Sequence, residues 1–358
     1  MPTTFRNLFP RICTFEALLA AYRRARRGKR SRPDVAAFEF RCEEQLLLLA
    51  EELAGGRYRP GPYRSFRITE NGKPRTISAA PFRDRVVHHA LCAELEPIWE
   101  ARFIHDSYAS RPGKGVHAAL DRAQHFARGH RYALLLDVQQ FFPSIDHTLL
   151  RGLLARHIAD PQVLALIDAI LAGGADTLRD AYRMVYFPGD DLFAAYRPRG
   201  LPIGNQTSQF WANVYLHPLD LFIKQELRCR AYVRYCDDLL LFANDKATLH
   251  SWRATVIERA AALRLTVHER RAQVVPVTHG VPFLGWHVFP QRRRLKRRNV
   301  LAFARRFRQL RRRYAGGACS LDTVHASVRG WIAHAAHGNT LALRRSLLAA
   351  PLPRWCRP

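Results

Sequence analysis

Two neighbouring aspartates interrupt an apolar stretch of the chain. Residues 231–243 read Ala-Tyr-Val-Arg-Tyr-Cys-Asp-Asp-Leu-Leu-Leu-Phe-Ala, so Asp237 and Asp238 lie between two runs that favour β-strands. Aspartate is rare in strands, and two charges in a poorly hydrated setting are costly unless a cation or hydrogen bonds offset them. A hairpin turn explains the pair equally simply, because turns tolerate aspartate well. This segment alone leaves both a turn and a metal site open.

A third carboxylate follows another predicted strand. Residues 132–138 (Tyr-Ala-Leu-Leu-Leu-Asp-Val) predict a buried strand that ends at Asp137. If this strand lies beside the 231–243 hairpin, three carboxylates meet in an all-oxygen site that suits Mg²⁺ or Mn²⁺. Two such ions about 3.5–4 Å apart are typical of phosphoryl transfer to an alkoxide. Asp146 is better explained as the N-cap of a helix over 147–157 and is left out of the site.

The surrounding pattern predicts an α+β fold, with a small sheet flanked by helices and a basic helical segment at the C-terminal end. Asn71-Gly72 between alternating segments predicts a β-hairpin over 63–79. Further strands are expected over 132–138, 231–243 and 281–288. Helices are expected over 14–28, 34–54, 84–100, 147–157, 160–173, 206–228, 299–314 and 321–336.

Charge and composition limit the classes of function. The chain has 358 residues, 48% of them hydrophobic, so it can bury a substantial core. Its formal net charge of +27 cannot be neutralised internally and predicts a polyanionic partner, in the first place nucleic acid. No apolar run reaches the roughly 18–20 residues that cross a bilayer, and no secretory signal is visible. Seven cysteines without a Cys-x-x-Cys pair predict reduced thiols in the cytoplasm.

Taken together, these residues resemble a reverse transcriptase. Tyr235-Cys236-Asp237-Asp238 matches the family's Tyr-x-Asp-Asp box, and residues 137–142 match its first carboxylate motif. Residues 283–286 (Phe-Leu-Gly-Trp) match the element at the base of the thumb. The resemblance covers about residues 5–345 and implies a right-hand polymerase. It implies fingers over 1–130 and 147–200, a palm over 131–146 and 201–288, a helical basic thumb over 289–345, and a tail over 346–358.

A loop before a predicted helix is similar to one subgroup, the reverse transcriptases of diversity-generating retroelements. Residues 203–209 read Ile-Gly-Asn-Gln-Thr-Ser-Gln, where most group II intron-type enzymes carry Gln-Gly-x-x-x-Ser-Pro. Residues 81–91, 103–108, 215–220 and 330–335 fit the same subgroup. The subgroup implies a bacterial or phage-encoded enzyme that copies a template RNA with errors mainly at adenines. The cDNA diversifies a target gene, and a small basic accessory variability protein takes part.

The resemblance also implies a role for each matching residue. Asp137, Asp237 and Asp238 would hold two Mg²⁺ ions, or Mn²⁺, with help from the Val138 carbonyl. Arg75, and less directly Arg67, would contact the triphosphate of the dNTP, and Phe142 would exclude a ribose 2′-hydroxyl. Ile203, in place of a glutamine, would weaken discrimination between correct and incorrect pairs. The other expected nucleotide-binding residues are Gly204, Tyr235, Cys236 and Arg271. The RNA/cDNA duplex would contact Arg111, Lys114, Arg292, Arg293, Arg294, Arg305, Arg306 and Arg308.

Two alternatives remain open at this point. The first is a group II intron or phage-defence reverse transcriptase. Against an intron protein we count the 203–209 loop and the expected lack of endonuclease and splicing extensions; nothing after residue 345 resembles an RNase H or integrase domain. The second is a non-catalytic RNA-binding scaffold. The presence of all three carboxylates argues against it, because a scaffold has no reason to maintain buried charges.

Overall fold

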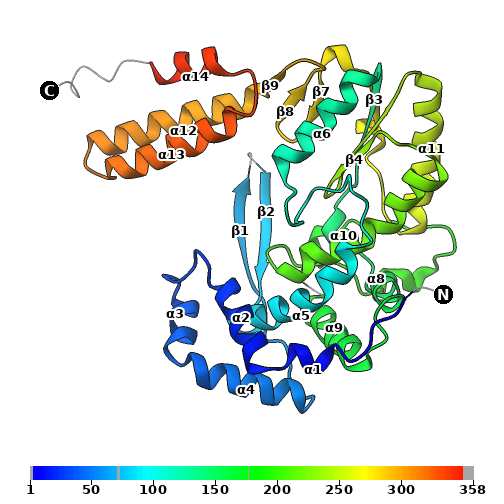
Figure 1. Ribbon diagram of the computed structural model, residues 1–358, viewed down its shortest axis with the longest axis vertical. Coiled ribbons are helices and arrows are strands. Elements are labelled where there is room, and N and C mark those ends of the chain that lie inside the picture. Colours follow the sequence, from blue (N-terminus) through cyan, green and yellow to red (C-terminus); the bar gives the residue numbers. More distant parts are fainter. Residues whose placement is uncertain (1–2, 71–72, 176, 350–358) are drawn as a thin grey trace.

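The computed structural model describes residues 3–70, 73–175 and 177–349 and shows an α+β architecture (Figure 1). Its centre is a four-stranded antiparallel sheet of order β4-β5-β3-β6. The strands are β3 (Tyr132–Asp137), β4 (Tyr232–Tyr235), β5 (Asp238–Ala243) and β6 (Gln273–Pro276). The predicted strand over 132–138 therefore lies beside the predicted hairpin over 231–243, which confirms the arrangement that brings the aspartates together.

Each face of this sheet packs into a different hydrophobic cluster. Leu134 of β3 and its cross-strand partner Leu241 face the larger cluster, whereas Ala133 and its partner Phe242 face the smaller one. This follows from the alternation of side chains along a strand. Helix α6 (Val116–Gly129) packs against β4 and β5 and contributes to the smaller cluster. The sheet is thus covered on both faces, which explains the nearly unbroken apolar runs of its central strands.

Helices from both halves of the chain build the larger cluster. Thr14 and Asp146 cap α2 and α8 as their residue types predict, by accepting hydrogen bonds from the backbone N–H groups of Ala17 (3.2 Å) and Leu149 (2.9 Å). The helices of this part are α1 (Phe9–Ile12), α2 (Phe15–Ala25), α3 (Pro33–Phe40), α4 (Cys42–Ala54), α5 (Phe82–Glu100), α7 (Phe141–Ser144), α8 (His147–Ala155), α9 (Pro161–Gly174), α10 (Gln206–Leu221) and α11 (Lys246–Ala262).

The expected continuous helix over 34–54 is wrong. The backbone leaves the helical region at Arg41 (φ −120°, ψ 39°), so two helices, α3 and α4, meet at a bend there. The bend lets the side chains of Phe38 and Leu46 both enter the core. Helical periodicity alone could not reveal it, because both halves keep apolar residues at helical spacing.

A two-stranded hairpin extends from the helical part (Figure 1). Strands β1 (Arg64–Glu70) and β2 (Lys73–Ala79) pair antiparallel and so form the predicted hairpin, with Ser65 opposite Ser78. The turn residues Asn71 and Gly72 lie outside the described residues. Near its base the hairpin is tied to the loop before α10, because the N–H of Ser78 donates to the carbonyl of Ile203 at 3.1 Å.

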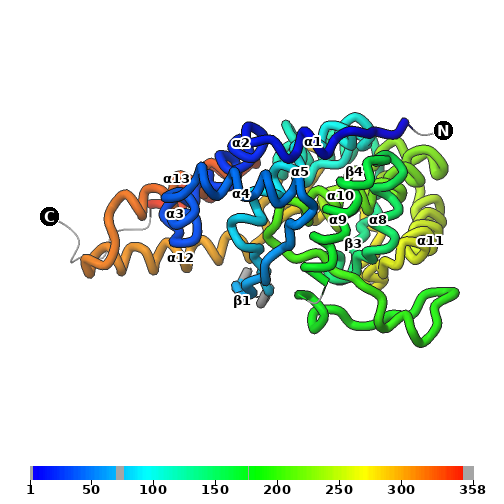
Figure 2. The backbone as a smooth tube through the Cα atoms, turned by 90° about the horizontal axis from the view of Figure 1, so that it is seen from below, coloured from blue at the N-terminus to red at the C-terminus, as the bar shows by residue number. Residues whose placement is uncertain are grey.

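The C-terminal part forms a separate helical lobe. A small sheet of β7 (Val281–Phe283), β8 (Trp286–Val288) and β9 (Arg293–Leu295) leads into α12 (Arg297–Ala315), α13 (Leu321–Ala335) and α14 (Leu341–Leu348). Figure 2 shows that α12 and α13 run outward from the rest of the chain. Stacking of Phe303 on Trp331, with ring centroids 4.0 Å apart, joins α12 to α13. We call α12–α14 the C-terminal lobe.

Several elements of the structure were not predicted. They include α1, α6, α11, α14, β6 and β9. Among the described residues, none of the helices is long and apolar enough to cross a membrane. The described cysteines, which exclude Cys356, are all free thiols.

Candidate active site

The three aspartates gather where β3 and β4 end and β5 begins. Asp137 is the last residue of β3 and lies directly opposite Asp238, the first residue of β5. Such cross-strand neighbours hold their Cβ atoms about 4.5–5.5 Å apart. Asp237 occupies the two-residue turn between Tyr235 and Asp238, and its carbonyl accepts a hydrogen bond from the N–H of Val138 at 3.2 Å. The backbone thus brings all three residues of the sequence-based site to one end of the sheet.

Electrostatic crowding at the site shifts the pKa of Asp238. Burial, and then the charges of Asp237 and Asp137, raise the pKa of Asp238 to about 7, although Lys296 and Arg271 act in the opposite direction. One carboxylate among like charges therefore binds a proton near neutral pH. A cation at this point would supply the missing positive charge and displace that proton.

The Asp137 carboxylate is paired with an arginine in the structure. Asp137 accepts a hydrogen bond from Nη1 of Arg271 at 2.9 Å, and the Arg271 side chain is 55% exposed. Among the described residues, no three His, Cys, Asp or Glu side chains converge as ligands of one ion. The donor set still fits Mg²⁺, because it is all oxygen and carries excess negative charge. Asp137, Asp237 and Asp238 would hold such ions once Asp137 turned away from the exposed arginine.

A pocket of about 420 Å³ opens beside Asp137 and Asp238. Lys296, directly before α12, and Arg298 also line this pocket, and the N–H of Lys296 donates to the carbonyl of Gly285 at 2.9 Å. Burial, followed by the charge of Arg298, lowers the pKa of Lys296, whereas Asp238 acts to raise it. The sequence-based prediction missed Lys296. The available signal was its place in the basic run 292–298, a few residues after the 283–286 motif.

A buried ion pair lies beneath the Cys236–Asp237 turn. The guanidinium of Arg234 contacts both carboxylate oxygens of Asp220, with Nη2 2.7 Å from Oδ2, and both side chains are almost wholly inaccessible. Its Nη1 donates to the carbonyl of Cys236 at 3.2 Å. Cys236 has a left-handed backbone (φ 55°), which a non-glycine residue adopts only at a cost. Burial raises the pKa of its thiol above the ordinary range. The sequence-based prediction missed Arg234 and Asp220.

Phe142, which is predicted to exclude a ribose 2′-hydroxyl, lies beside the segment that leads into the 203–209 loop. The half-buried Phe142 accepts a hydrogen bond at its carbonyl from the N–H of Leu201 at 2.9 Å. Ile203 is also half-buried. Gly204 adopts φ +118°, and a Cβ there would lie 3.2 Å from Cγ2 of Ile77 on β2. Glycine at 204 therefore allows the loop to approach the hairpin closely.

The structure describes the side chain of one of the two hairpin arginines, Arg67, and only the backbone of the other, Arg75. Arg67 on β1 is exposed and lies opposite Thr76. Arg75 belongs to β2 and lies opposite Ile68 in the backbone register, but its side chain is outside the described residues. The contacts of both arginines with a nucleotide, like the role of Val138 as a metal ligand, stay predictions.

The structure separates the expected duplex-binding residues into two groups. Arg111 and Arg293 are not available for phosphates: the Arg111 side chain is 5% exposed and pairs with Glu100 at 2.7 Å, and that of Arg293 is 9% exposed and pairs with Asp121 at 2.6 Å. Lys114 is half-buried and donates to the carbonyl of His105 at 3.0 Å. A charge count cannot distinguish arginines in buried ion pairs from exposed ones. The exposed members are Arg292, Arg294, Arg305, Arg306 and Arg308.

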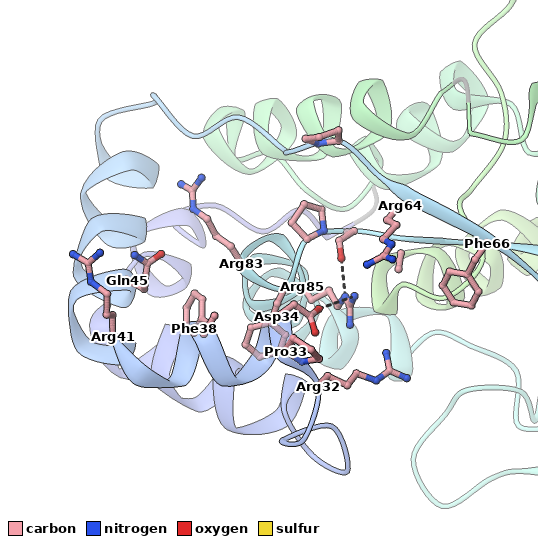
Figure 3. A pocket seen from close by; sticks show the side chains of 16 residues that line it. Arg32, Pro33, Asp34, Phe38, Arg41, Gln45, Arg64, Phe66, Arg83 and Arg85 are labelled. Atoms are coloured by element: carbon pink, nitrogen blue, oxygen red, sulfur yellow. Dashed lines mark hydrogen bonds and ion pairs between the residues drawn. The ribbon is translucent and has the colours of Figure 1, made fainter.

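A second basic site lies between α3, the start of α4 and the base of the β1–β2 hairpin. This pocket measures about 760 Å³, and we call it the basic pocket (Figure 3). Arg32 and Arg64 line it and make no hydrogen bond or ion pair through their side chains with other described residues, whereas Arg85 pairs with Asp34 at 3.6 Å. Phe66, 46% exposed, adds an aromatic surface. Unpaired arginines beside an exposed ring suit single-stranded nucleic acid.

Carboxylates at one end of a small antiparallel sheet, in a chain with exposed arginines in a basic pocket and on α12, are typical of the class of nucleic acid polymerases. Comparison with known proteins specifies the family. Residues 65–288, more than half of the chain, match the family model "Reverse transcriptase (RNA-dependent DNA polymerase)". The chain belongs to this family and is an RNA-directed DNA polymerase. Reverse transcriptases copy an RNA template with nucleotides as substrates, and they use divalent metal ions as cofactors.

The similar proteins include intron-encoded ones. "Protein YkfC" of Escherichia coli (strain K12) is 28% identical over 305 residues, which are 73% of this chain and 76% of that protein. "Group II intron-encoded protein LtrA" of Lactococcus lactis subsp. cremoris is 30% identical over 51% of this chain and 29% of its own length. "Nuclear intron maturase 1, mitochondrial" of Arabidopsis thaliana is 35% identical over 28% of this chain and 14% of its own. The chain thus spans less than a third of the length of these two intron proteins.

Proposed function

We propose that this chain copies a template RNA into error-prone cDNA at Asp137, Asp237 and Asp238, and that the cDNA serves to diversify a target gene. The observation that carries the polymerase part is the cross-strand pairing of Asp137 with Asp238 beside the turn that holds Asp237. Metal ions bound there would lower the pKa of the primer 3′-hydroxyl and neutralise charge on the triphosphate.

The chain's own residues would bind and orient the substrates. We assign residues 1–130 and 147–200 to the fingers, 131–146 and 201–288 to the palm, 289–345 to the thumb and 346–358 to a tail. Residues 350–358 of that tail lie outside the described residues. Lys296 and Arg271 line the pocket at the carboxylates and would attract the triphosphate. Phe142 would lie against the sugar, and the C-terminal lobe would hold the RNA/cDNA duplex by its phosphates.

The diversity-generating role rests on the 203–209 loop. An isoleucine at 203 cannot form the hydrogen bond that a glutamine side chain offers, so this position cannot penalise a misplaced nucleotide in that way. We further propose a cytoplasmic enzyme that works with a small basic accessory variability protein. The second candidate is a group II intron-type reverse transcriptase, favoured by the similarity to LtrA.

The Ile203→Gln variant tests the proposed role. Primer extension on an RNA template followed by cDNA sequencing should show fewer errors opposite template adenines than wild type. Ile203→Leu is the matched control, because it keeps the apolar character, and it should keep the wild-type spectrum. An unchanged spectrum in Ile203→Gln would contradict the role of residue 203. Infrequent, evenly spread errors in the wild type would favour the intron-type candidate.

A further inference from the structure

The buried Arg234–Asp220 pair has no evident purpose as a source of stability. Arg234 and Asp220 are each 0% exposed. A buried ion pair often contributes no more to stability than apolar side chains of similar volume, because both charges lose their hydration. Further hydrogen bonds hold both side chains in place: the Tyr232 hydroxyl donates to Asp220 at 2.8 Å, and Arg234 Nη1 donates to Asn213 at 3.0 Å.

The Arg234 side chain also contacts the turn that carries Asp237. Besides Asp220 and Asn213, the guanidinium contacts the carbonyl of Cys236, the residue with the left-handed backbone. That carbonyl belongs to the peptide that joins Cys236 to Asp237, so its orientation determines where Asp237 begins. The Arg234 main chain is also fixed: its N–H donates to the carbonyl of Asp106, and its carbonyl accepts from the N–H of Tyr108, both at 2.9 Å.

We propose that Arg234, itself oriented by Asp220, is a positioning residue that fixes the Cys236–Asp237 turn so that Asp237 and Asp238 can bind metal ions together with Asp137. Mutation of residues that orient the metal ligands through hydrogen bonds commonly lowers metal affinity or activity by about 10–100-fold. The inference rests on the proposed function. It makes a separate statement, however, about the affinity of the carboxylates for metal.

The test needs a variant that lacks the positioning hydrogen bond and still folds. Removing one partner of a buried ion pair leaves an unpaired charge and destabilises the fold strongly. We therefore choose the double variant Arg234→Met/Asp220→Asn. It removes both charges, fills the space of the arginine stem and keeps an oxygen acceptor for Tyr232. Arg230→Met, which removes a nearby exposed arginine, is the control.

Three properties of the full chain are measured. They are Mn²⁺ affinity by calorimetry, the rate of primer extension with Mg²⁺, and the dissociation constant of a primer–template duplex, each well below the melting temperature. We expect the double variant to bind Mn²⁺ and to extend primers about 10–100-fold less well than wild type. Its affinity for the duplex should stay within about twofold, and Arg230→Met should bind Mn²⁺ like wild type.

Wild-type Mn²⁺ affinity in the folded double variant would overturn the inference. An equal loss of duplex affinity would also overturn it, because Arg234 would then act on the whole palm. If the double variant does not fold, Arg234→Lys, which keeps the charge but not the paired hydrogen bonds, is measured in the same way against the same outcomes. Absence of primer extension by the wild type would refute the proposed polymerase activity, whereas Mn²⁺ affinity would still decide the positioning role.

Discussion

At the scale of single residues, the carboxylates are held close enough to repel one another. The raised pKa of Asp238, the contact of Arg271 with Asp137 and the nearby Lys296 are three responses to the same excess of negative charge. A site built only for stability would avoid this arrangement, because buried like charges are costly. A site that binds cations requires it. The same residues therefore account for both the local electrostatics and the chemistry.

A buried histidine predicts how the stability of the chain depends on pH. His88 is fully buried, neither ring nitrogen has a hydrogen-bond partner among the described residues, and burial lowers its pKa to about 3. The unfolded chain binds a proton at this histidine below about pH 6.5, whereas the folded chain does not. The unfolded state thus takes up more protons as the pH falls. The contribution of neutral, buried His88 to the free energy of unfolding therefore decreases between about pH 6.5 and pH 3.

Replacement of this histidine tests the prediction. The free energy of unfolding of wild type should fall as the pH is lowered from 7 to 5, and His88→Leu should show a shallower decrease. Urea denaturation at several pH values measures both. His125→Leu, at an exposed position on α6, is the control and should leave the slope unchanged. Parallel curves for His88→Leu and wild type would contradict the assignment.

At the scale of elements, the β1–β2 hairpin and the loop before α10 act as one unit. The Asn205 side chain, 1% exposed, donates to the carbonyls of Ser78 and Pro202 and accepts from the N–H of Ala80. Asn205→Ala should leave these groups unsatisfied and cost about 1–3 kcal/mol of stability. Since the hairpin would also loosen, the KM for dNTP should rise more than kcat falls. Steady-state kinetics and denaturation measure the two effects, and an unchanged KM would refute the coupling.

The basic pocket is an element-scale feature, because α3, the start of α4 and the hairpin base form it together. Arg32→Ala/Arg64→Ala should weaken binding of a primer–template with a long single-stranded template overhang. Affinity for a duplex with a one-nucleotide overhang should not change, since this duplex does not need the pocket. The salt dependence of the long-overhang complex should also become shallower, by about 1 for each phosphate that the variant no longer neutralises. Arg156→Ala/Arg228→Ala, which removes two exposed arginines elsewhere, is the control. Equal losses for both substrates would contradict the assignment.

Sequence reasoning succeeded where local patterns determine structure. The hairpin, the caps at Thr14 and Asp146 and the strands that carry the aspartates follow from turn chemistry, capping and apolar runs. It failed where tertiary contacts decide. The bend at Arg41 has no sequence signal of its own. Helix α6 was also missed, because one of its faces is polar, although its other face packs against the sheet. Arg234 resembled an ordinary strand residue, because its partner Asp220 is distant in sequence.

At the scale of the whole molecule, the positive charge is divided between structural and exposed roles. Arg111 and Arg293 hold the fold together through ion pairs, whereas α12 presents exposed arginines along its length. The outward direction of the C-terminal lobe gives this helix an accessible surface (Figures 1 and 2). Such a surface suits a duplex that is bound by its phosphates, without regard to sequence.

Neutralising this surface should weaken duplex binding uniformly. Arg305→Ala/Arg306→Ala/Arg308→Ala should reduce affinity for RNA/DNA duplexes of any sequence, and the slope of log K against log salt should decrease by up to about 3. Fluorescence anisotropy at several salt concentrations measures both quantities. The melting temperature should stay within a few degrees, since these side chains are exposed. A loss that depends on the duplex sequence would contradict binding through phosphates.

The central claim is that Asp137, Asp237 and Asp238 form the catalytic site of an RNA-directed DNA polymerase. The most direct measurement is incorporation of deoxynucleotides on a primed RNA template with Mg²⁺, followed by sequencing of the cDNA. The control is Asp237→Ala/Asp238→Ala. The account predicts extension by wild type, no extension by the double variant, and errors concentrated opposite template adenines. Equal extension by both proteins, or none by wild type even with its cognate template RNA and accessory protein supplied, would contradict it.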